Sequence, residues 1–473
     1  MQMLSESAPD TVSPPAPGSG SRGGGSGGGS GRSRAEKVGK VTVKVGGDVG
    51  IGAGRQGEPL GAQKRLRNLS LALQKLPRSA NVGNVAELME GQQLVQHNMT
   101  TLLLSLKRRH KWRVAWLFAE WAERPDCPLS LSTMHYNLLM SACSRAAPQR
   151  TLDILERMRA PRDVVTYNTA MAAALNNEDP TRSLELLNEM DASGLSPTTI
   201  SFNTAISACA KTAEWEMALE LFRRMETEGV ERSTITYTGL INACAEGLQL
   251  DKAMALFTYM EVAGVPRNPI TYAVAINACT RNNQWELGLQ LLQEMGRKGV
   301  QPDTVVYNAA ISACEKGRAW ETALQLLNQM RRVGIRLTPV TYGAGISACE
   351  KGKQWQRALE LLDQMRENRV RPNTIVYSAA ISACGTAGQW RTALGLFDEM
   401  STNRIAQNTI TYNAAIQACE RGDAWREAIN LFERMREVGV PQDTITYNAV
   451  VRACERAGQW ELAFDFMRQM ELK

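Results

Sequence analysis

Nine cysteines occupy one position of a repeating unit. An aromatic residue returns every 35 residues from Tyr167 to Tyr447, with an earlier step at Tyr136, and each of these cysteines follows such an aromatic by seven residues. They are Cys143, Cys209, Cys244, Cys279, Cys314, Cys349, Cys384, Cys419 and Cys454. No Cys-x-x-Cys pair occurs, and equivalent helices of adjacent units lie about 8–10 Å apart, which is too far for a disulfide. The row therefore predicts small buried side chains in a reducing compartment, with no metal and no cofactor.

A second set of side chains could bind a ligand. Positions −2, +1, +5 and +9, counted from the aromatic of each unit, share one face of a helix. Position −2 is β-branched in every unit from Tyr167 onward: Val165, Ile200, Ile235, Ile270, Val305, Val340, Ile375, Ile410 and Ile445. Position +9 is usually basic: Lys211, Arg281, Lys316, Lys351, Arg421 and Arg456.

Position +1 varies although its surroundings do not. Its residues are small and mostly polar: Asn137, Asn168, Asn203, Thr238, Ala273, Asn308, Gly343, Ser378, Asn413 and Asn448. An apolar side chain, a hydrogen-bonding side chain and a cation, repeated at unit spacing, suit a single-stranded nucleic acid with flat bases and charged phosphates. The alternative is a solvated helix face whose late Lys and Arg residues complement the helix dipole. That alternative leaves the variation at +1 unexplained.

The elements that carry these rows follow from a second, apolar stripe. In the unit that begins at Thr304, apolar residues stand at i, i+3, i+4 and i+7: Tyr307, Ala310, Ile311 and Cys314. This spacing predicts a first helix that is buried on one side. Gly317 is expected to end that helix in the left-handed conformation.

A second helix is predicted from Trp320 to Met330, with Gly334 closing it and Thr338 capping the next first helix. Trp recurs at the same position in most other units, as Trp215, Trp285, Trp355, Trp390, Trp425 and Trp460, and Met recurs near the end of the second helix. Such rows could line a ligand site, but helical spacing in nearly every unit favours core packing.

Helix pairs at one period predict an all-α fold. We expect a right-handed superhelical α-solenoid of helix-turn-helix repeats with a period of 35 residues. Residues 132–473 form the array of about ten units, residues 81–131 form degenerate N-terminal capping helices, and residues 1–80 form a disordered Gly/Ser/Pro-rich tail. Scattered Ser and Arg residues make this tail a possible transit segment, although Glu6 and Asp10 are acidic and come early.

Net charge does not by itself indicate nucleic-acid binding. Residues 1–134 hold 18 Lys/Arg and 10 Asp/Glu, so only 36 Lys/Arg and 38 Asp/Glu of the totals of 54 and 48 remain in the repeats. Anion binding by the array must therefore come from basic side chains gathered on one face. No run of 18 apolar residues occurs, so no membrane association is expected.

The C-terminal unit ends in apolar residues. Phe464 and Phe466 follow Trp460, and no polar capping helix comes after Met470. We expect this uncapped edge to pair with a protein partner or a second copy of the chain.

The units resemble pentatricopeptide repeats. The resemblance rests on Val305-Val306-Tyr307-Asn308, Ala323-Leu324, Met330 and Gly334 in one unit and extends from about Ser132 to Met470. That family comprises organellar RNA-binding proteins that recognise one base per helical repeat. The resemblance implies a chloroplast or mitochondrial location and a role in RNA processing, stability or translation.

The resemblance also implies which residues contact a base. In the family the residue at +1 acts together with the last residue of the same unit, and the β-branched residue at −2 sandwiches the base while +9 meets phosphate. The implied pairs are Asn137 with Asp163, Asn168 with Thr198, Asn203 with Ser233, Thr238 with Asn268, Ala273 with Asp303, Asn308 with Thr338, Gly343 with Asn373, Ser378 with Asn408, and Asn413 with Asp443.

The family's code implies a target of 5′-U-Y-C-A-?-Y-A-A-U-3′. Asn with Asp favours U, Asn with Ser favours C, and Thr, Ser or Gly with Asn favours A. The last residues of the units are also good helix N-caps, so capping alone could select them.

No constellation of catalytic residues stands out. His97, His110 and His135 lie outside any His-x-Glu or Cys-x-x-Cys setting, and the glycines from Gly46 to Gly57 are not followed by Lys-Ser or Lys-Thr. We therefore expect a binding protein and not an enzyme. The alternative function is a protein-protein interaction scaffold of the tetratricopeptide type, which the near-neutral charge of the repeats favours.

Overall fold

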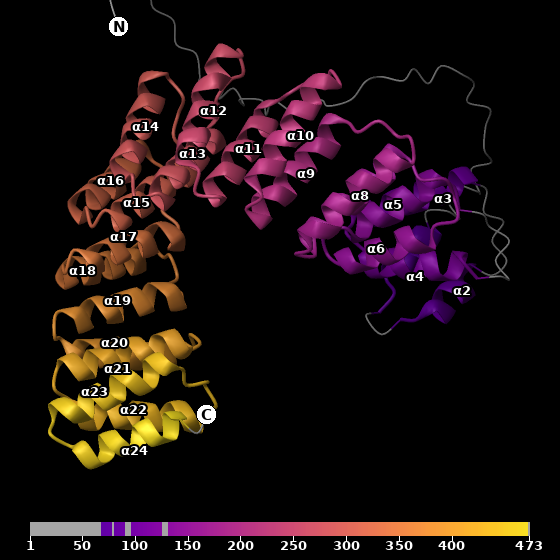
Figure 1. Ribbon diagram of the computed structural model, residues 1–473. Coiled ribbons are helices and arrows are strands. Elements are labelled where there is room, and N and C mark those ends of the chain that lie inside the picture. Colours follow the sequence, from indigo (N-terminus) through magenta and orange to yellow (C-terminus); the bar gives the residue numbers. More distant parts are fainter. Residues whose placement is uncertain (1–67, 78–79, 90–95, 125–130, 472–473) are drawn as a thin grey trace, which may run out of the picture. The chain divides into compact units, whose positions relative to one another are not determined.

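Paired helices make up nearly all of the described chain. The computed structural model describes residues 68–77, 80–89, 96–124 and 131–471 (Figure 1). Most of the predicted tail, and with it the possible transit segment, lies outside these residues, as does Cys127. In the described residues no helix is long and apolar enough to cross a membrane.

Ten units contribute one first helix and one second helix each. The first helices are α5 (Thr133–Cys143), α7 (Val164–Asn176), α9 (Thr199–Thr212), α11 (Thr234–Glu246), α13 (Pro269–Arg281), α15 (Thr304–Lys316), α17 (Pro339–Lys351), α19 (Thr374–Thr386), α21 (Thr409–Arg421) and α23 (Thr444–Arg456). The second helices are α6 (Pro148–Arg157), α8 (Pro180–Ala192), α10 (Trp215–Thr227), α12 (Leu250–Val262), α14 (Trp285–Arg297), α16 (Trp320–Val333), α18 (Trp355–Glu367), α20 (Trp390–Thr402), α22 (Trp425–Glu437) and α24 (Trp460–Glu471).

Each first helix packs against its own second helix and against the first helices of the units before and after it, as α15 does with α13 and α17. Figure 1 shows the helices coloured in chain order, so the units can be followed from α5 to α24. The all-α solenoid of helix pairs that the sequence predicted is therefore confirmed.

The apolar stripe of the first helix is the core. Tyr307, Ala310, Ile311 and Cys314 are at most 2% exposed, and the same positions are buried along the array. Second helices add a buried Ala, Leu and Met, which in α16 are Ala323, Leu327 and Met330. The predicted packing role of the methionines is confirmed.

The tryptophans lie at the edge of the core. Residues Trp215, Trp285, Trp320, Trp355, Trp390 and Trp425 are partly buried, and Trp460 is 58% exposed. Trp215, Trp285, Trp355 and Trp425 pack against the core as predicted. Trp285 also lies against the end of the next first helix, where a Cβ added to Gly317 would stand only 2.3 Å from the indole ring.

This contact also corrects the prediction for Gly317. Gly317 has φ −76°, and the left-handed residue is Arg318, with φ 55°. Gly317 is therefore required for the close approach of Trp285 and not for its backbone conformation. Gly334, with φ 78°, does end its helix in the left-handed conformation as predicted.

Three helices precede the first complete unit. They are α2 (Val82–Met89), α3 (Gln96–Arg108) and α4 (Trp112–Ala122), and both α3 and α4 contact α5. Residues 68–74 are also helical, although the sequence analysis placed them in the tail. Leu69 and Leu73 account for the difference because both are buried among the apolar residues of this region. That these helices act as a cap stays a prediction.

One of the two phenylalanines expected at the C-terminal edge is buried. Phe466 is 8% exposed and packs edge-on against Phe432, with ring centroids 5.2 Å apart. Phe464 is 65% exposed. The apolar edge of α24 therefore consists of Phe464 and Trp460.

The nine cysteines in the repeats are buried and free. Burial raises the pKa of eight of these thiols from 9.0 to about 11 or about 12, and it also raises the pKa of Cys454. Each thiol favours the folded state only while it is protonated. Its contribution to stability is present below pH 9 and is lost as the pH rises through the folded-state pKa.

We therefore predict that the array loses stability steeply between pH 9 and about pH 11. The measurement is the urea midpoint of helicity by circular dichroism, in the presence of a reductant. In a Cys314→Ala, Cys384→Ala variant the midpoint should fall less steeply with pH, because two of the titrating groups are gone. A midpoint that is constant up to pH 11 would contradict the buried-thiol interpretation.

Candidate nucleic-acid interface

The β-branched residues at −2 form an exposed row. They are 54% to 70% exposed, although Val and Ile are among the residues most often buried in proteins. Each stands at the second position of a first helix and so lies close to the helix N-terminus. An exposed apolar residue in every unit requires an explanation other than packing within the array.

The last residue of each unit caps the following first helix. The nine residues Asp163, Thr198, Ser233, Asn268, Asp303, Thr338, Asn373, Asn408 and Asp443 are all N-caps with extended backbone conformation. In α23, for example, the Thr446 backbone N–H donates to Asp443 Oδ1 at 2.9 Å. The capping role that the sequence raised as a competing explanation is therefore present at these positions.

The structure brings three of the predicted pairs into direct contact. The amide Nδ2 of Asn137 donates to both carboxylate oxygens of Asp163, at 3.0 and 3.3 Å. Asn413 and Asp443 repeat this geometry at 3.0 and 3.2 Å. Asn168 Nδ2 lies 3.4 Å from Thr198 Oγ1.

The two carboxylates are held ionised. Burial alone would raise the pKa of Asp443, but hydrogen bonds from the hydroxyl and backbone N–H of Thr446 and from Asn413 outweigh it and lower the pKa below its ordinary value. For Asp163, burial is likewise outweighed by hydrogen bonds from Thr166 and Asn137. Each Asn–Asp pair therefore offers an N–H donor beside a charged acceptor.

The remaining +1 residues behave differently. The hydroxyls of Thr238 and Ser378 donate to the carbonyls of Thr234 and Thr374, both at 2.7 Å. Ala273 and Gly343 are buried. Asn308 Oδ1 is buried without a hydrogen-bond partner. The structure therefore does not join these residues directly to the last residues of their units.

Sequence reasoning missed the residue just before each aromatic, at position −1. Thr446 is 0% exposed, and its Oγ1 lies 2.6 Å from Asn413 Oδ1 and 2.8 Å from Asp443 Oδ1. The third residue of one first helix thus touches the +1 residue of the preceding unit. Its signal in the sequence is a Ser, Thr or Val at −1.

The basic residues at +9 are exposed, but several have protein partners. Arg281 pairs with Glu246 at 2.7 Å, and Arg456 pairs with Asp423 at 3.3 Å. Lys211 donates to the Leu175 carbonyl at 2.6 Å. The contact of Lys211 with the Leu175 carbonyl, and that of Arg456 with the Glu420 carbonyl at 3.1 Å, are those expected of cations that complement the helix dipole. Lys316 and Arg421 form no ion pair within the described part of the chain.

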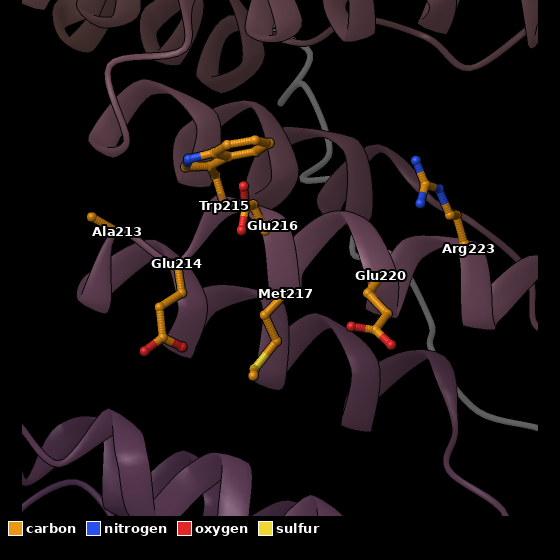
Figure 2. A pocket seen from close by; sticks show the side chains of 7 residues that line it. All are labelled: Ala213, Glu214, Trp215, Glu216, Met217, Glu220 and Arg223. Carbon is orange, nitrogen blue, oxygen red and sulfur yellow. The ribbon is translucent and has the colours of Figure 1, made fainter.

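A pocket on α10 lies away from these rows. Figure 2 shows Trp215 and Met217 among three carboxylates, Glu214, Glu216 and Glu220. These residues belong to a second helix and its preceding turn, so the pocket is not part of the candidate interface. Within the described ranges no group of three or more His, Cys, Asp or Glu residues could hold a metal ion.

Ten helix pairs with a period of 35 residues define this chain as an α-solenoid repeat protein. The pentacotripeptide-repeat region of PRORP matches residues 198–373, and the PPR repeat family matches residues 162–211, 372–421 and 407–456. A PPR repeat also matches residues 445–473. These matches together span 312 of the 473 residues, and the chain belongs to the pentatricopeptide repeat family.

Solved structures of this family have a similar fold. The pentatricopeptide repeat protein PPR10 in complex with an 18-nt psaJ RNA element is 19% identical, with a TM-score of 0.69 over 87% of this chain and 60% of that chain. A crystal structure of PPR10 from maize is 18% identical, with a TM-score of 0.51 over 85% of this chain and 68% of that chain. The chain thus spans three fifths of the RNA-bound relative. No curated protein matches the chain by sequence.

The capping role of Asp443 can be separated from any role in binding. We predict that Asp443→Ala lowers the free energy of unfolding by about 1 kcal/mol, because the N-cap acceptor is lost. Asp443→Asn should change it by less than about 0.5 kcal/mol, because Asn is an equally good cap. Urea unfolding measures both, and equal stability of the two variants would show that the cap contributes nothing.

Proposed function

We propose that the chain binds single-stranded RNA in a sequence-specific manner, with one unit for each base, and that it acts in RNA processing, stability or translation in a chloroplast or mitochondrion. The observation that carries the proposal is the exposed β-branched residue in each of nine units, accompanied in three units by a hydrogen-bonded pair of the +1 and last residues. Function here consists of binding, and no cofactor takes part.

The exposed −2 row supplies a surface for bases. Successive Val and Ile side chains belong to adjacent first helices, so a base can insert between two of them and exclude water from both of its faces. Flat bases gain about 1–3 kcal/mol each from stacking on protein side chains in single-strand binding proteins. We assign this role to residues Val165, Ile200, Ile235, Ile270, Val305, Val340, Ile375, Ile410 and Ile445.

The polar pairs supply discrimination between bases. Uracil presents a carbonyl acceptor next to its N3–H donor, and this pattern complements the Asn413 N–H and the ionised Asp443 carboxylate. Cytosine has an unprotonated N3, which would face the carboxylate as a second acceptor. The pairs at Asn137 and Asn413 therefore favour U, as the family's code implies. For the whole array we propose the target 5′-U-Y-C-A-?-Y-A-A-U-3′.

The chain's similarity to RNA-bound PPR10 supports RNA as the ligand, although at 19% identity it concerns the fold. The second candidate is a protein-interaction scaffold. It is favoured by the pairing of Arg281 with Glu246 and of Arg456 with Asp423, which leaves fewer free cations for phosphate.

Selection of RNA from a random pool tests the proposal at a single base. We predict that Asp443→Ser changes the preferred base of that unit from U to C by about tenfold, because a hydroxyl can donate to cytosine N3 where a carboxylate cannot. Ser also remains a good N-cap, so the fold is retained. Enrichment that changes at several bases, or at none, would refute one-unit-one-base recognition.

Salt dependence separates RNA from a protein ligand. We predict that Arg421→Ala lowers the slope of log affinity against log salt by about 0.7, the value for one phosphate contact in a single strand. Arg426→Ala is the matched control, because Arg426 lies on α22 over the Trp425 ring, 5.2 Å from its centroid. Equal slopes for the wild type and both variants would show that Arg421 does not meet phosphate.

A further inference from the structure

The residue at position −1 is buried in each of the nine units that follow the first unit of the array. These residues are Thr166, Ser201, Thr236, Thr271, Val306, Thr341, Val376, Thr411 and Thr446, and each is 0% exposed. Each is the third residue of its first helix. A buried hydroxyl must find a hydrogen-bond partner.

In five units that partner is the +1 side chain of the preceding unit. The distances from the −1 hydroxyl are 2.7 Å to Asn137 Oδ1, 2.6 Å to Asn168 Oδ1, 2.7 Å to Asn203 Oδ1, 2.8 Å to Thr238 Oγ1 and 2.6 Å to Asn413 Oδ1. The −1 residue thus lies behind the +1 residue.

The residue types at the two positions match throughout the array. Where the +1 residue is Asn, Thr or Ser, the −1 residue of the next unit is Thr or Ser. Where the +1 residue is Ala273 or Gly343, the −1 residue is Val306 or Val376. Capping does not account for this match, because Asp303 and Asn373 cap their helices through backbone N–H groups even with Val at −1.

The energetics of buried polar groups explain the match. An amide oxygen facing the methyl groups of Val would be left without a donor, which costs about 1–3 kcal/mol. A −1 hydroxyl can also bond to the N-cap residue of its own helix, as Thr411 does with the Asn408 carbonyl at 2.7 Å. A Cβ added to Gly343 would lie 3.7 Å from Val376 Cγ2, which is ordinary van der Waals contact. The joint between units is therefore hydrogen-bonded in five units and apolar in the Ala273 and Gly343 units. In the Asn308 and Ser378 units the −1 hydroxyl bonds to the N-cap residue of its own helix instead.

We propose that the residue at −1 of the following unit is a third specificity-determining residue of each base site. This inference rests on the RNA-binding function proposed above. Because the −1 hydroxyl donates to the amide oxygen of an Asn at +1, it holds Nδ2 as the group that faces the last residue and the base. If the Asn side-chain amide could flip by about 180°, it would present either its NH2 donor or its oxygen acceptor to the base and could pair with either pyrimidine.

The need for this hydroxyl differs between units. In the Asn413 unit the Asp443 carboxylate accepts from Nδ2 and holds the same orientation. In the Asn203 unit the last residue is Ser233, whose hydroxyl lies 3.2 Å from Thr236 Oγ1, and Thr236 donates to the amide oxygen. The orientation of Asn203 therefore depends on Thr236 far more than that of Asn413 depends on Thr446.

The first test removes the hydroxyl and keeps the shape of the side chain. In Thr236→Val we expect the preference for C over U at the third base to fall by about threefold to tenfold, the value of one hydrogen bond. Thr236→Ser should keep the preference, and Thr446→Val should change that of the last unit by less than about twofold. Val fits this position sterically, because Val306 and Val376 occupy it fully buried, and Thr236→Ser controls for changes in packing.

The second test builds a hydrogen-bonded joint in an apolar unit. Gly343→Asn and Val376→Thr are made singly and together, and both the urea midpoint and the base preference are measured. We expect each single variant to lower the midpoint and the double variant to recover most of the loss, because only the double variant pairs the two polar groups. At the base that faces this unit, only the double variant should gain a preference for one pyrimidine over the other.

The two tests separate the inference from the function on which it rests. If the wild type selects C at the third base and Thr236→Val selects it equally well, the role of position −1 is refuted while RNA binding stands. If the Gly343→Asn, Val376→Thr variant recovers the stability lost in the single variants, but neither the wild type nor any variant selects RNA, the proposed function is refuted. The joint then has a structural role only. Additive stabilities in the second test would refute the hydrogen-bonded joint itself.

Discussion

The packing of each first helix between two others is the constraint on which the rest of the structure depends. A single unit has an apolar stripe that its own second helix covers only in part, so the first helices before and after it must cover the remainder. Small residues stand where first helices approach: a Cβ added to Gly385 of α19 would lie 2.9 Å from the Ala418 Cβ of α21. Polar groups buried at these joints need hydrogen-bond partners, and in five units the protein supplies them through position −1.

That requirement links the candidate interface to stability. Asp443 caps α23, bonds to Asn413 and stands next to the exposed Ile445. A residue that would contact a base therefore also starts a helix, and the residue behind it fills the joint between units. Changes at the interface are consequently restricted to residues that both cap a helix and satisfy their neighbours. Ser, Thr, Asn and Asp meet the first condition, and the −1 residue sets the second.

Periodicity predicted the helices, their boundaries and most of the core, because a helical stripe that recurs in every unit has a single packing solution. It was less successful at the turns. Gly317 was expected to have positive φ, but Arg318 has it, and Gly317 makes room for Trp285 instead. The tryptophans were expected in the core, and four of them pack at its edge, whereas Trp460 is exposed. Composition identifies glycine and tryptophan as important but does not say which neighbour they meet.

The sequence by itself determined the repeat, the exposed β-branched row and the variable position +1. It also contained the match between positions −1 and +1. Because the two positions are about 33 residues apart in most units, the sequence alone does not show that they touch. Only the tertiary structure placed Thr236 against Asn203 and Val376 against Gly343. The physical reason is that local periodicity dictates which face of a helix is apolar, whereas the partner of a buried hydroxyl is set by how adjacent units stack.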